Sequence, residues 1–565
     1  MCAHSIKSRI TGFAVTEADT SWIQRAADRV EQHAAETGAS TVVCASGISP
    51  SGPIHLGNLR EVITAHFVAE ELKARGRDTV HLHSWDDYDR FRKVPVGLDE
   101  SLLKEHVGRP LAAVPDPCGE HDSYASHFIA EFTAALTRLG IRMHEVRQSV
   151  RYPSGAYNAA IRTAMDHRGV TFDILARYQT EGRHDQPPAE RRAAYYPFKP
   201  YCQVCGRDLT TVTSYAGETV GYLCRCGHEG RMSLADGAET SGKLVWKVDW
   251  PMRWVHEGVD FEPAGEDHHA PSSSFASGEE IIREIFGGIR PYGFPYSFVG
   301  LSGGSSKMSG SAGGGAVPAT ALDVLEPTMV RWLYARRTPS QAFSIDLTPR
   351  AVQRLYDEWD QFLDRADTPE GSNTDRHLRD ICLRTTAGEV AGSPRRVSFR
   401  LLSSAADITQ ANQAQIARIV GQHLDDTEPA VDEGKLLQSL RPRLTCAINF
   451  ATRLLPVEER TVVRNEFNTA AWDGLDERTR EGVRLLTAEL DSRWSLEDLT
   501  RLVYGVPKQL LGLPEDTKPT PELKKAQRSF FIALYRLLCT ADTGPRLPTL
   551  MLSIGPDLTK ALLTP

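Results

Sequence analysis

The sequence predicts an α/β domain that is interrupted by an insertion and followed by a helical C-terminal half. Three observations predict this. Strand-like and helical patterns alternate between residues 41 and 84, strand-like runs return between 244 and 299, and after about residue 320 the patterns are helical. A strand, a loop, a helix and a second strand in succession are typical of the βαβ crossover of a parallel sheet.

The first crossover spans residues 41–84. Residues 41–45 are β-prone, and residues 46–53 are rich in Ser, Gly and Pro. Apolar residues then recur at helical spacing from Leu56 to Arg75, and Gly76 ends the pattern. The apolar face of this helix comprises Leu59, Val62, Ile63, Phe67 and Leu72. Residues 78–83 predict the second strand of the crossover.

The rest of the chain divides into an irregular middle and a helical end. Residues 105–240 carry four clustered cysteines, and strands are predicted at 244–248 and 296–299 with a helix near 278–287 between them. A Gly/Ser-rich loop follows at 300–315. Beyond it, three amphipathic faces predict helices. They comprise Val352, Leu355, Tyr356, Trp359, Phe362 and Leu363; Leu436, Leu437, Leu440 and Leu444; and the apolar residues between Leu523 and Leu538.

The composition is that of a globular chain with several domains. A length of 565 residues, 41% hydrophobic and 24% charged, excludes a disordered chain, a collagen-like chain and a small disulfide scaffold. The net charge is −8, from 65 Lys and Arg against 73 Asp and Glu, so we expect no DNA partner bound through bulk positive charge. No run approaches the roughly 20 apolar residues of a membrane span, and no signal-peptide pattern opens the chain, so we expect a cytoplasmic protein without a membrane partner.

The first chemical motif is the segment 49–58, SPSGPIHLGN. His55, Gly57 and Asn58 lie where a loop turns into the first turn of a predicted helix. Free N–H groups and the helix dipole favour a phosphate there, a glycine allows close approach, and the histidine can donate to a phosphoryl oxygen. The alternative for His55 alone is a helix cap.

The second chemical motif is KMSGS at 307–311, in the Gly/Ser-rich loop. Lys307, with neighbouring hydroxyl and backbone N–H groups, suits a loop that closes on a phosphate where negative charge grows during nucleotidyl transfer. The alternative is a simple Gly/Ser linker. The order of the two motifs along the chain favours the phosphate interpretation.

The third motif is a cysteine cluster in the insertion. Cys202 and Cys205 form a CxxC pair, and Cys224 and Cys226 form a CxC pair. Four thiolates can surround a tetrahedral zinc ion and leave no open position, so we predict a structural site that staples an insertion poor in strands. His228 is an alternative ligand, and a redox-active cysteine pair is the alternative chemistry.

The HxGN and KMSGS motifs resemble the paired signatures of class I aminoacyl-tRNA synthetases. Five blocks are similar to class I lysyl-tRNA synthetases in particular: residues 44–62, 83–95, 114–128, 243–268 and 307–311. The resemblance implies an enzyme that activates L-lysine with ATP and Mg²⁺ to lysyl-adenylate and transfers lysyl to tRNA(Lys). In the same family the insertion carries metal ligands, although the ligand sets vary.

The resemblance also implies the domain organisation. A Rossmann-type catalytic domain would occupy 1–104 and 241–315, split by a zinc-bearing connective insertion at 105–240. Residues 316–350 would contact the tRNA stem, and residues 351–565 would form an all-α anticodon-binding region. In the helical part of the chain after about residue 320, arginines could contact phosphates, and Phe467 and Trp472 could stack on bases. Solvated surface arginines are the alternative. The arginines are Arg331, Arg336, Arg337, Arg441, Arg443 and Arg453.

The resemblance further implies site residues. Those for ATP are Pro53, His55, Gly57, Asn58, Gly265, Asp267, Lys307, Met308 and Ser309, of which His55, Gly57, Asn58, Lys307 and Ser309 are catalytic. Those for the amino acid are Gly47, Trp246, His268 and Tyr296, to which the positive charge of a lysine side chain adds Asp249.

A lysine substrate needs an apolar channel for its methylenes and an acceptor for its ammonium group. Trp246, Trp250 and Tyr296 could wall the channel, and Asp86, Asp87 or Asp249 could accept the charge. The alternatives are core packing for the tryptophans and a solvated turn at 86–87.

One departure from the family pattern concerns the KMSGS loop. The family commonly continues this motif with a second lysine, whereas Ala312 follows it here. A glutamate-type synthetase, a nucleotidylyltransferase of the same superfamily and a tRNA-binding paralogue without activity remain as alternative functions, and Ala312 favours only the last of them.

Overall fold

The computed structural model describes residues 20–178, 186–302, 316–384, 395–422, 432–490 and 494–565. The chain divides into two compact units. The first unit comprises Met1–Ala321, Pro327–Asp346 and Phe362–Val390, and the second comprises Leu322–Glu326, Leu347–Gln361 and Ala391–Pro565. Within the described residues, no helix combines the length and apolarity that crossing a membrane requires.

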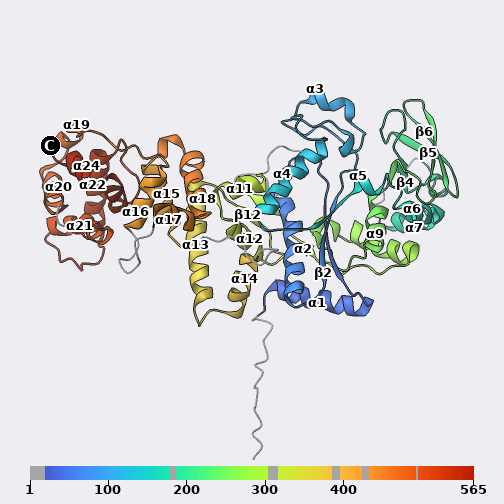
Figure 1. Cartoon of the computed structure of the whole chain (residues 1–565), viewed down its shortest axis with the longest axis horizontal. Coiled ribbons are helices and arrows are strands. Elements are labelled where there is room, and N and C mark those ends of the chain that lie inside the picture. Colours follow the sequence, from blue (N-terminus) through green and yellow to red (C-terminus); the bar gives the residue numbers. More distant parts are fainter. Residues whose placement is uncertain (1–19, 179–185, 303–315, 385–394, 423–431, 491–493) are drawn as a thin grey trace, which may run out of the picture. The chain divides into compact units, whose positions relative to one another are not determined.

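The first unit is built on a parallel sheet (Figure 1). β1 (Val42–Ile48) pairs with β2 (Thr79–Trp85), and β2 pairs with β3 (His144–Arg147). On the other side of β1, Cys44 bridges Phe261 and Phe261 bridges Tyr292, both in parallel. Two short strands continue these lines, β9 (Ala264–Gly265) and β10 (Pro295–Tyr296). The strand order therefore reverses at β1, which is the Rossmann-type arrangement that the sequence predicts.

The predicted crossover helix is α2 (Leu56–Ala74), which begins after His55 and ends before the left-handed Gly76. Its buried residues cover nearly its whole circumference and include Arg60 and Glu70, so the helix is a central element and not one with a single apolar face. It packs against α1 (Trp22–Thr37), α12 (Pro327–Ala335) and α14 (Asn373–Leu383). Four further helices of this part of the chain are α3 (Glu100–Leu103), α4 (Tyr124–Arg138), α5 (Gln148–Arg151) and α11 (Pro318–Val324).

One strand prediction in this unit is wrong, and one strand of the unit was not predicted. The strand predicted at 244–248 is only β8 (Gly242–Leu244), and α9 (Trp246–His256) follows it at once. Periodicity in a short apolar run does not distinguish a strand from a buried helix, and burial of Val248 and Trp250 on α9 decided for the helix. Conversely, β12 (Phe343–Ile345) pairs in parallel with β11 (Val299–Leu301), in a region where only helix is predicted. The helix predicted near 278–287 is α10 (Ser274–Ile281), continued by a π-helical turn, η5 (Ile282–Phe286).

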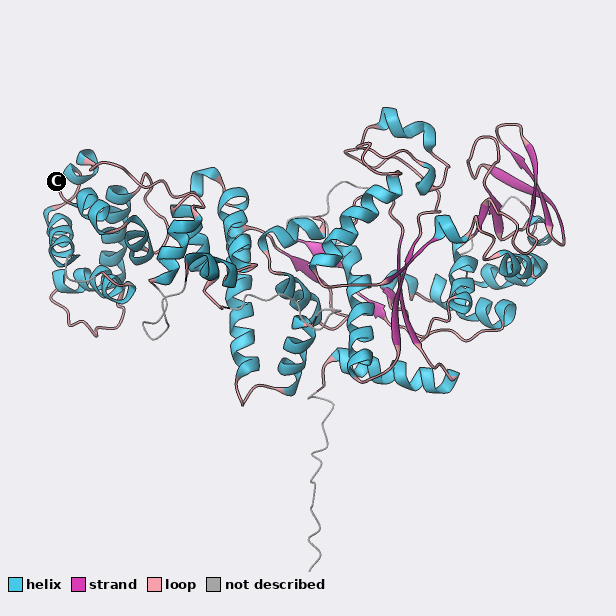
Figure 2. Cartoon of the chain, in the orientation of Figure 1, coloured by secondary structure: helices cyan, strands magenta, loops and turns pink. Residues whose placement is uncertain are grey.

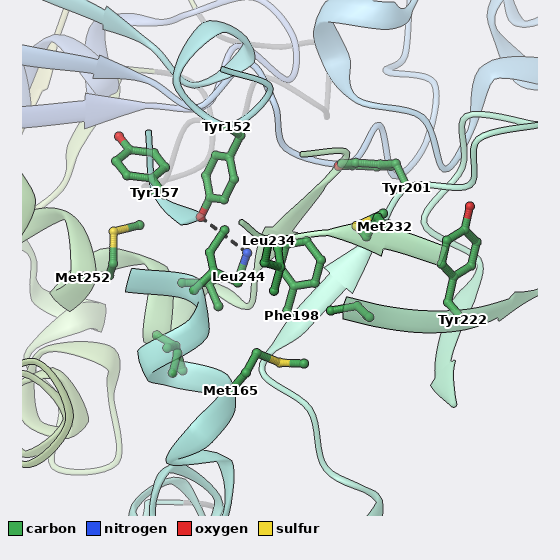
Figure 3. Packing of buried hydrophobic residues seen from close by; sticks show 14 of the residues in the cluster. Tyr152, Tyr157, Met165, Phe198, Tyr201, Tyr222, Met232, Leu234, Leu244 and Met252 are labelled. Carbon is green, nitrogen blue, oxygen red and sulfur yellow. Dashed lines mark hydrogen bonds between the residues drawn. The ribbon is translucent and has the colours of Figure 1, made fainter. Parts of the chain in front are cut away.

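The insertion has strands and a core of its own, contrary to the prediction. β5 (Thr210–Ala216), β6 (Thr219–Cys224) and β7 (Glu229–Ser233) form an antiparallel sheet, and β4 (Phe198–Pro200) pairs with β8. The helices beside them are α6 (Asn158–Asp166), α7 (Arg168–Arg177) and α8 (Pro188–Ala194). Tyr152, Met165, Phe198 and Tyr222 belong to one buried cluster, which Met252 of α9 joins (Figure 3). This cluster also joins the insertion to α9 within the first unit.

The second unit is built of helices joined by loops, and its described residues contain no strand beyond one isolated bridge (Figure 2). The first amphipathic face lies on α13 (Pro349–Asp367), all of its six members are buried, and Tyr356 stacks on Phe399 at 3.7 Å. The second face is divided between two helices by Pro442, and the third lies on α22. The helices after α14 are α15 (Phe399–Ile408), α16 (Gln413–Gly421), α17 (Glu433–Ser439), α18 (Arg443–Asn449), α19 (Thr469–Asp473), α20 (Glu477–Glu489), α21 (Leu496–Leu510), α22 (Pro521–Leu538), α23 (Leu547–Ile554) and α24 (Pro556–Leu563).

Three of the predicted tRNA-contact residues are buried in the protein. In the first unit, Arg331 donates to the carbonyl groups of Leu139 and Ile381. In the second unit, Arg443 is paired with two carboxylates, those of Glu326 at 2.6 Å and Asp360 at 2.7 Å. Trp472 is part of a hydrophobic core. The predictions for these three residues are wrong, because their polar groups and ring face are used within the fold.

Candidate active site

Two cavities open at the carboxyl ends of the strands, beside the point where the order of the sheet reverses. One has a volume of about 330 Å³ and the other of about 710 Å³. Ser49, Glu61 and His268 line both of them. Open α/β sheets bind their ligands at this topological switch point, so the two cavities together form the candidate active site.

The smaller cavity is lined by the first turn of α2. His55 occupies the N-cap position, and Asn58 Oδ1 accepts a hydrogen bond of 3.2 Å from its backbone N–H. The cap and phosphate interpretations of His55 are therefore compatible, since the backbone caps the helix while the side chain lines the cavity. Gly57 and Asn58 line the same cavity. The N-terminus of a long helix facing a cavity favours an anionic ligand.

The opposite wall of the smaller cavity comes from β9 and the turn η4 (Glu266–His268). Gly265 has no side chain, and a Cβ at this position would lie 2.6 Å from Asp267 Oδ1. The glycine thus allows the Asp267 carboxylate to fold back over the main chain beside the cavity that both residues line. Pro53 lines this cavity as well, whereas Lys307, Met308 and Ser309 lie outside the described residues.

The larger cavity has an aromatic wall on α9. Trp246 and Trp250 stack with their ring centroids 5.1 Å apart, and the His268 ring lies 5.4 Å from that of Trp250. Trp250 is buried, yet it also lines the cavity, so core packing and a place in the wall are combined in one side chain. Gly47, at the end of β1, lines the same space.

Glu61 is the acid at the junction of the two cavities, and the sequence-based prediction does not include it. One carboxylate oxygen accepts a hydrogen bond of 2.7 Å from the Gly47 N–H, and the other accepts one of 2.9 Å from the Tyr296 hydroxyl. Burial raises the pKa of Glu61 to about 8, although the Gly47 N–H acts against this. Among the described residues, no basic side chain forms an ion pair with it.

A sequence signal for Glu61 does exist. It follows Gly57 by four positions and Asn58 by three, which places it on the same face of α2 as those residues. An acid on that face is directed at whatever the HxGN motif binds.

The acids that the sequence offers for an ammonium group lie in a network of buried ion pairs. Asp86 lines the larger cavity and accepts a hydrogen bond of 2.8 Å from Arg253. Burial alone would raise the pKa of Asp86, but Arg253 and Lys243 lower it. Asp249 lies 3.4 Å from Lys243 Nζ and 3.3 Å from Arg253 Nε and lines neither cavity.

Asp87 also has its carboxylate hydrogen-bonded within the protein. Its carboxylate accepts a hydrogen bond of 2.6 Å from Arg147 and one of 2.8 Å from the N–H of Ser149. Both Asp86 and Asp87 are buried, so the alternative of a solvated turn at 86–87 is wrong. The sequence shows an acid pair but does not show the arginines, from distant segments, that neutralise it.

The four cysteines of the insertion converge. The Sγ atoms of Cys202 and Cys226 are 3.7 Å apart, as are those of Cys205 and Cys224, and all four lie within 4.8 Å of one another. Bonds of about 2.3 Å from zinc to thiolate in a tetrahedron separate the sulfurs by about 3.8 Å, so the geometry fits that ion. His228 is not a member of this group.

A second group of metal-ligand type was missed at the sequence level. Asp116, Cys118, His121 and His127 bring one donor atom each to within 4.8 Å of the others. Asp116 Oδ1 lies 3.0 Å from His127 Nδ1, and Asp116 Oδ2 lies 3.2 Å from His121 Nδ1. One carboxylate, one thiolate and two imidazoles form a donor set that zinc accepts. The signal was present as four such residues within twelve positions of the 114–128 block.

Comparison with known proteins identifies the fold. Residues 20–383 match the family described as tRNA synthetases class I (K). The chain belongs to this family. It has the class I tRNA synthetase fold, with mixed α/β content and many helices in its C-terminal part.

Two curated relatives of this synthetase are similar over nearly their whole length. A lysine–tRNA ligase from Streptomyces coelicolor is 45% identical over 96% of this chain and 98% of the relative. A lysine–tRNA ligase from Pyrococcus horikoshii is 33% identical over 94% of this chain and 97% of the relative. Among solved structures, a glutamate tRNA ligase from Elizabethkingia meningosepticum matches with a TM-score of 0.42 and 14% identity, covering 93% of this chain and 98% of that one.

Proposed function

We propose that this synthetase is a lysine–tRNA ligase, which activates L-lysine with ATP to lysyl-adenylate and transfers the lysyl group to tRNA(Lys). Two findings support this activity. The chain belongs to the class I synthetases, and two relatives that match it over nearly their whole length are lysine–tRNA ligases. ATP is the nucleotide substrate of such an enzyme.

The observation that supports lysine as the amino acid is the half-buried carboxylate of Glu61. It has two neutral donors, Gly47 N–H and Tyr296 O–H, and no cationic partner among the described residues. An ammonium group placed there would ionise the acid and form a charge-assisted hydrogen bond. We therefore assign the ammonium acceptor to Glu61 in place of Asp249, with Trp246 and Trp250 along the methylenes.

The nucleotide is assigned to the smaller cavity. His55, Gly57 and Asn58 would hold phosphates at the N-terminus of α2, and Gly265 and Asp267 would receive the ribose, whose hydroxyls a carboxylate can accept. Pro53, Lys307, Met308 and Ser309 complete the ATP site by resemblance, and Lys307 and Ser309 would stabilise the departing pyrophosphate. Mg²⁺ would accompany the triphosphate and neutralise part of its charge.

The metal clusters and the remaining regions have supporting roles in this proposal. Zinc at Cys202, Cys205, Cys224 and Cys226 would be structural, because four protein ligands leave no position for water. The Asp116 cluster also offers four protein ligands, so a zinc ion bound there would be structural as well. The insertion at 105–240 would receive the acceptor end of tRNA, 316–350 would contact its stem, and 351–565 would bind the anticodon.

A glutamate-type synthetase is less well supported. A glutamate side chain needs an unpaired cation, and the two basic residues deep in the larger cavity, Lys243 and Arg253, are already neutralised by aspartates.

The test is pyrophosphate exchange with each of the twenty amino acids, with and without total tRNA. We expect exchange with lysine only, dependent on tRNA, and a loss of lysine-dependent exchange in Glu61→Gln. Asp260→Asn, which changes a buried acid outside both cavities, is the matched control and should exchange like the parent. Exchange driven by glutamate, or exchange independent of any amino acid, would contradict the proposal, as would tRNA binding without exchange.

A further inference from the structure

The loop before the HxGN helix is tied to a distant helix. Residues 49–55 belong to no helix or strand, and most of them line the smaller cavity. The hydroxyl of Tyr124, the first residue of α4, donates a hydrogen bond of 3.0 Å to the main-chain carbonyl of Ser51. Within the part of the chain that the structure describes, this is the one hydrogen bond that joins a side chain of another element to residues 49–54. Tyr124 therefore contributes to the position of this wall of the cavity.

The Tyr124 side chain has little freedom of its own. It is fully buried, and its ring centroid lies 5.0 Å from that of Phe91 and 5.0 Å from that of Phe128. Burial raises the pKa of Tyr124, so the hydroxyl stays protonated and acts as a donor at neutral pH. Buried tyrosine hydroxyls usually have a hydrogen-bond partner. What distinguishes this one is its acceptor, which lies in the wall of the cavity that is assigned to ATP.

The Asp116 cluster brackets Tyr124 in the sequence. His121 precedes the tyrosine by three positions, and His127 follows it by three. The Nδ1 atoms of these two histidines lie within 3.2 Å of the Asp116 carboxylate, one at each oxygen. An ion that joins the two imidazoles to the carboxylate would therefore fix the chain on both sides of Tyr124.

The loop that precedes α4 contains no regular element to fix it. Residues 114–123 form no strand and no helix. Asp116 Oδ2 accepts a hydrogen bond of 2.7 Å from the His121 N–H, and the Tyr124 N–H donates one of 2.9 Å to the Val114 carbonyl. In a loop of this kind a metal ion that joins distant side chains stabilises the closed arrangement, because it removes alternative conformations of the chain.

We propose that Tyr124 is a positioning residue of the nucleotide site, and that a zinc ion at the Asp116 cluster fixes it in that role. The ion holds the start of α4, and the Tyr124 hydroxyl transmits this order to the Ser51 carbonyl in the cavity wall. Metal binding and nucleotide binding are thereby coupled, so that each favours the other. The inference rests on the proposed ligase function, which assigns ATP to the smaller cavity.

The first test is Tyr124→Phe, which removes the hydroxyl and keeps the ring. The KM values for ATP and for lysine are measured by pyrophosphate exchange with tRNA present. We expect the KM for ATP to rise about fivefold, because one neutral hydrogen bond is lost, and the KM for lysine to stay the same. Tyr356→Phe is the matched control, since its buried hydroxyl donates to a carbonyl of the second unit, that of Val324. It should leave both KM values at the level of the parent.

The second test removes the metal. His127→Ala and Cys118→Ser each delete one ligand of the cluster, and elemental analysis measures the zinc that each variant retains. Both should raise the KM for ATP at least as much as Tyr124→Phe does. Adding Tyr124→Phe to His127→Ala should raise it no further, because changes that act through one contact are not additive. Hydrogen exchange of the main-chain amides at 49–55, followed by mass spectrometry, should be faster in each of these variants than in the parent and in Tyr356→Phe.

Each part of the inference has its own contrary result. An unchanged KM for ATP in Tyr124→Phe, or equal rises in the KM for ATP and for lysine, would overturn the role of Tyr124. Loss of zinc from the cluster with no change in the KM for ATP or in hydrogen exchange at 49–55 would overturn the coupling to the metal, as would a parent without zinc at this cluster.

Failure of the inference is distinguishable from failure of the proposed function. Lysylation of tRNA(Lys) is measured for the parent in the same preparations, and a parent that attaches no lysine refutes the ligase function. Hydrogen exchange at 49–55 does not depend on that activity. Equal exchange in Tyr124→Phe and the parent would therefore refute the inference whichever function the protein has.

Discussion

The imidazole ring of His55 lies against the main chain of Gly57. A Cβ at residue 57 would fall 2.8 Å from both Nδ1 and Cε1 of that ring, and 3.3 Å from the carbonyl oxygen of Val299. The two contacts at 2.8 Å are too short for a real Cβ, so the ring has its place beside the smaller cavity because residue 57 has no side chain. The two motif residues thus act as one packed unit.

Gly57→Ala should therefore displace the His55 ring. We expect adenylate formation to fall by roughly 10- to 100-fold, since overpacking of this kind costs about 1–3 kcal/mol. The measurement is lysine-dependent pyrophosphate exchange in the presence of tRNA. Gly505→Ala is the control, because a Cβ at that helical position meets no atom within 4 Å. An unchanged rate in Gly57→Ala would show that the ring position is unimportant.

The raised pKa of Glu61 predicts a dependence of stability on pH. An acid whose pKa rises from 4.5 to about 8 on folding stabilises the fold below its unfolded pKa, and this contribution is lost as the pH rises through 8. Glu61→Gln stays neutral at every pH. Without lysine, the free energy of unfolding of the variant minus that of the parent should therefore be larger at pH 9 than at pH 5. Thermal unfolding at the two pH values measures this.

Lysine binding should depend on the same group in the opposite sense. The parent's affinity for lysine should rise between pH 6 and pH 8.5, because the ammonium group needs the ionised carboxylate. Glu61→Gln should bind lysine about 100-fold more weakly and with a flat profile, since removal of one partner of a buried charge pair costs about 3 kcal/mol. Parallel profiles for the two proteins, measured by calorimetry, would exclude Glu61 as the acceptor.

The cysteine cluster predicts a measurable zinc content. Cys224→Ser should lose about one equivalent of zinc, and its thermal midpoint should fall, because metal binding contributes folding free energy to the insertion. Cys446→Ser, which changes a buried cysteine of the second unit, should keep its metal. Elemental analysis of freshly purified protein gives the answer, and a parent without zinc would refute the site.

The Asp116 cluster predicts a second, independent equivalent. His127→Ala should lower the zinc content from about two equivalents to about one and leave the cysteine site loaded. His144→Ala, an exposed histidine outside the cluster, serves as the control. If His127→Ala retained the full metal content of the parent, the four residues would be a hydrogen-bonded turn without a metal.

Lys307 stays a prediction from the sequence. Lys307→Ala should lower adenylate formation sharply with little effect on lysine binding, because its charge would act where pyrophosphate leaves. Ala312 after the motif makes Lys307 the only cation of the segment 303–315, so no neighbour should compensate. Pyrophosphate exchange with tRNA present, compared with Lys104→Ala, measures the effect. Equal rates in mutant and parent would overturn the assignment.

Local patterns predicted the crossover well. β1, α2 and β2 follow the predicted order because a strand, a turn-rich loop and an apolar helix are each encoded within a few neighbouring residues. The prediction was poorer at 244–248, where a β-prone run forms the start of α9. There, burial against other elements outweighed a local preference that is weak in a short segment.

The candidate site shows the same division. HxGN, the nearby pair of Gly265 and Asp267, and the cysteine pairs are local patterns. The structure brings His55, Gly57, Asn58, Gly265 and Asp267 to one cavity and the four cysteines together in another place. Glu61 and the Asp116 cluster were missed because their meaning depends on what faces them. Asp249 was chosen from its neighbours in sequence, whereas Lys243, Arg253 and Tyr152 occupy it in the fold.

By itself the sequence determined the family, the crossover with its HxGN turn, and the grouping of four cysteines, since each is a property of residue types at short spacing. Only the tertiary structure decided which acids are free to meet a substrate. A carboxylate's availability depends on burial and on cations from distant segments, and these are established when the chain packs. Asp86 and Asp249 meet arginine and lysine there, and Glu61 meets only neutral donors.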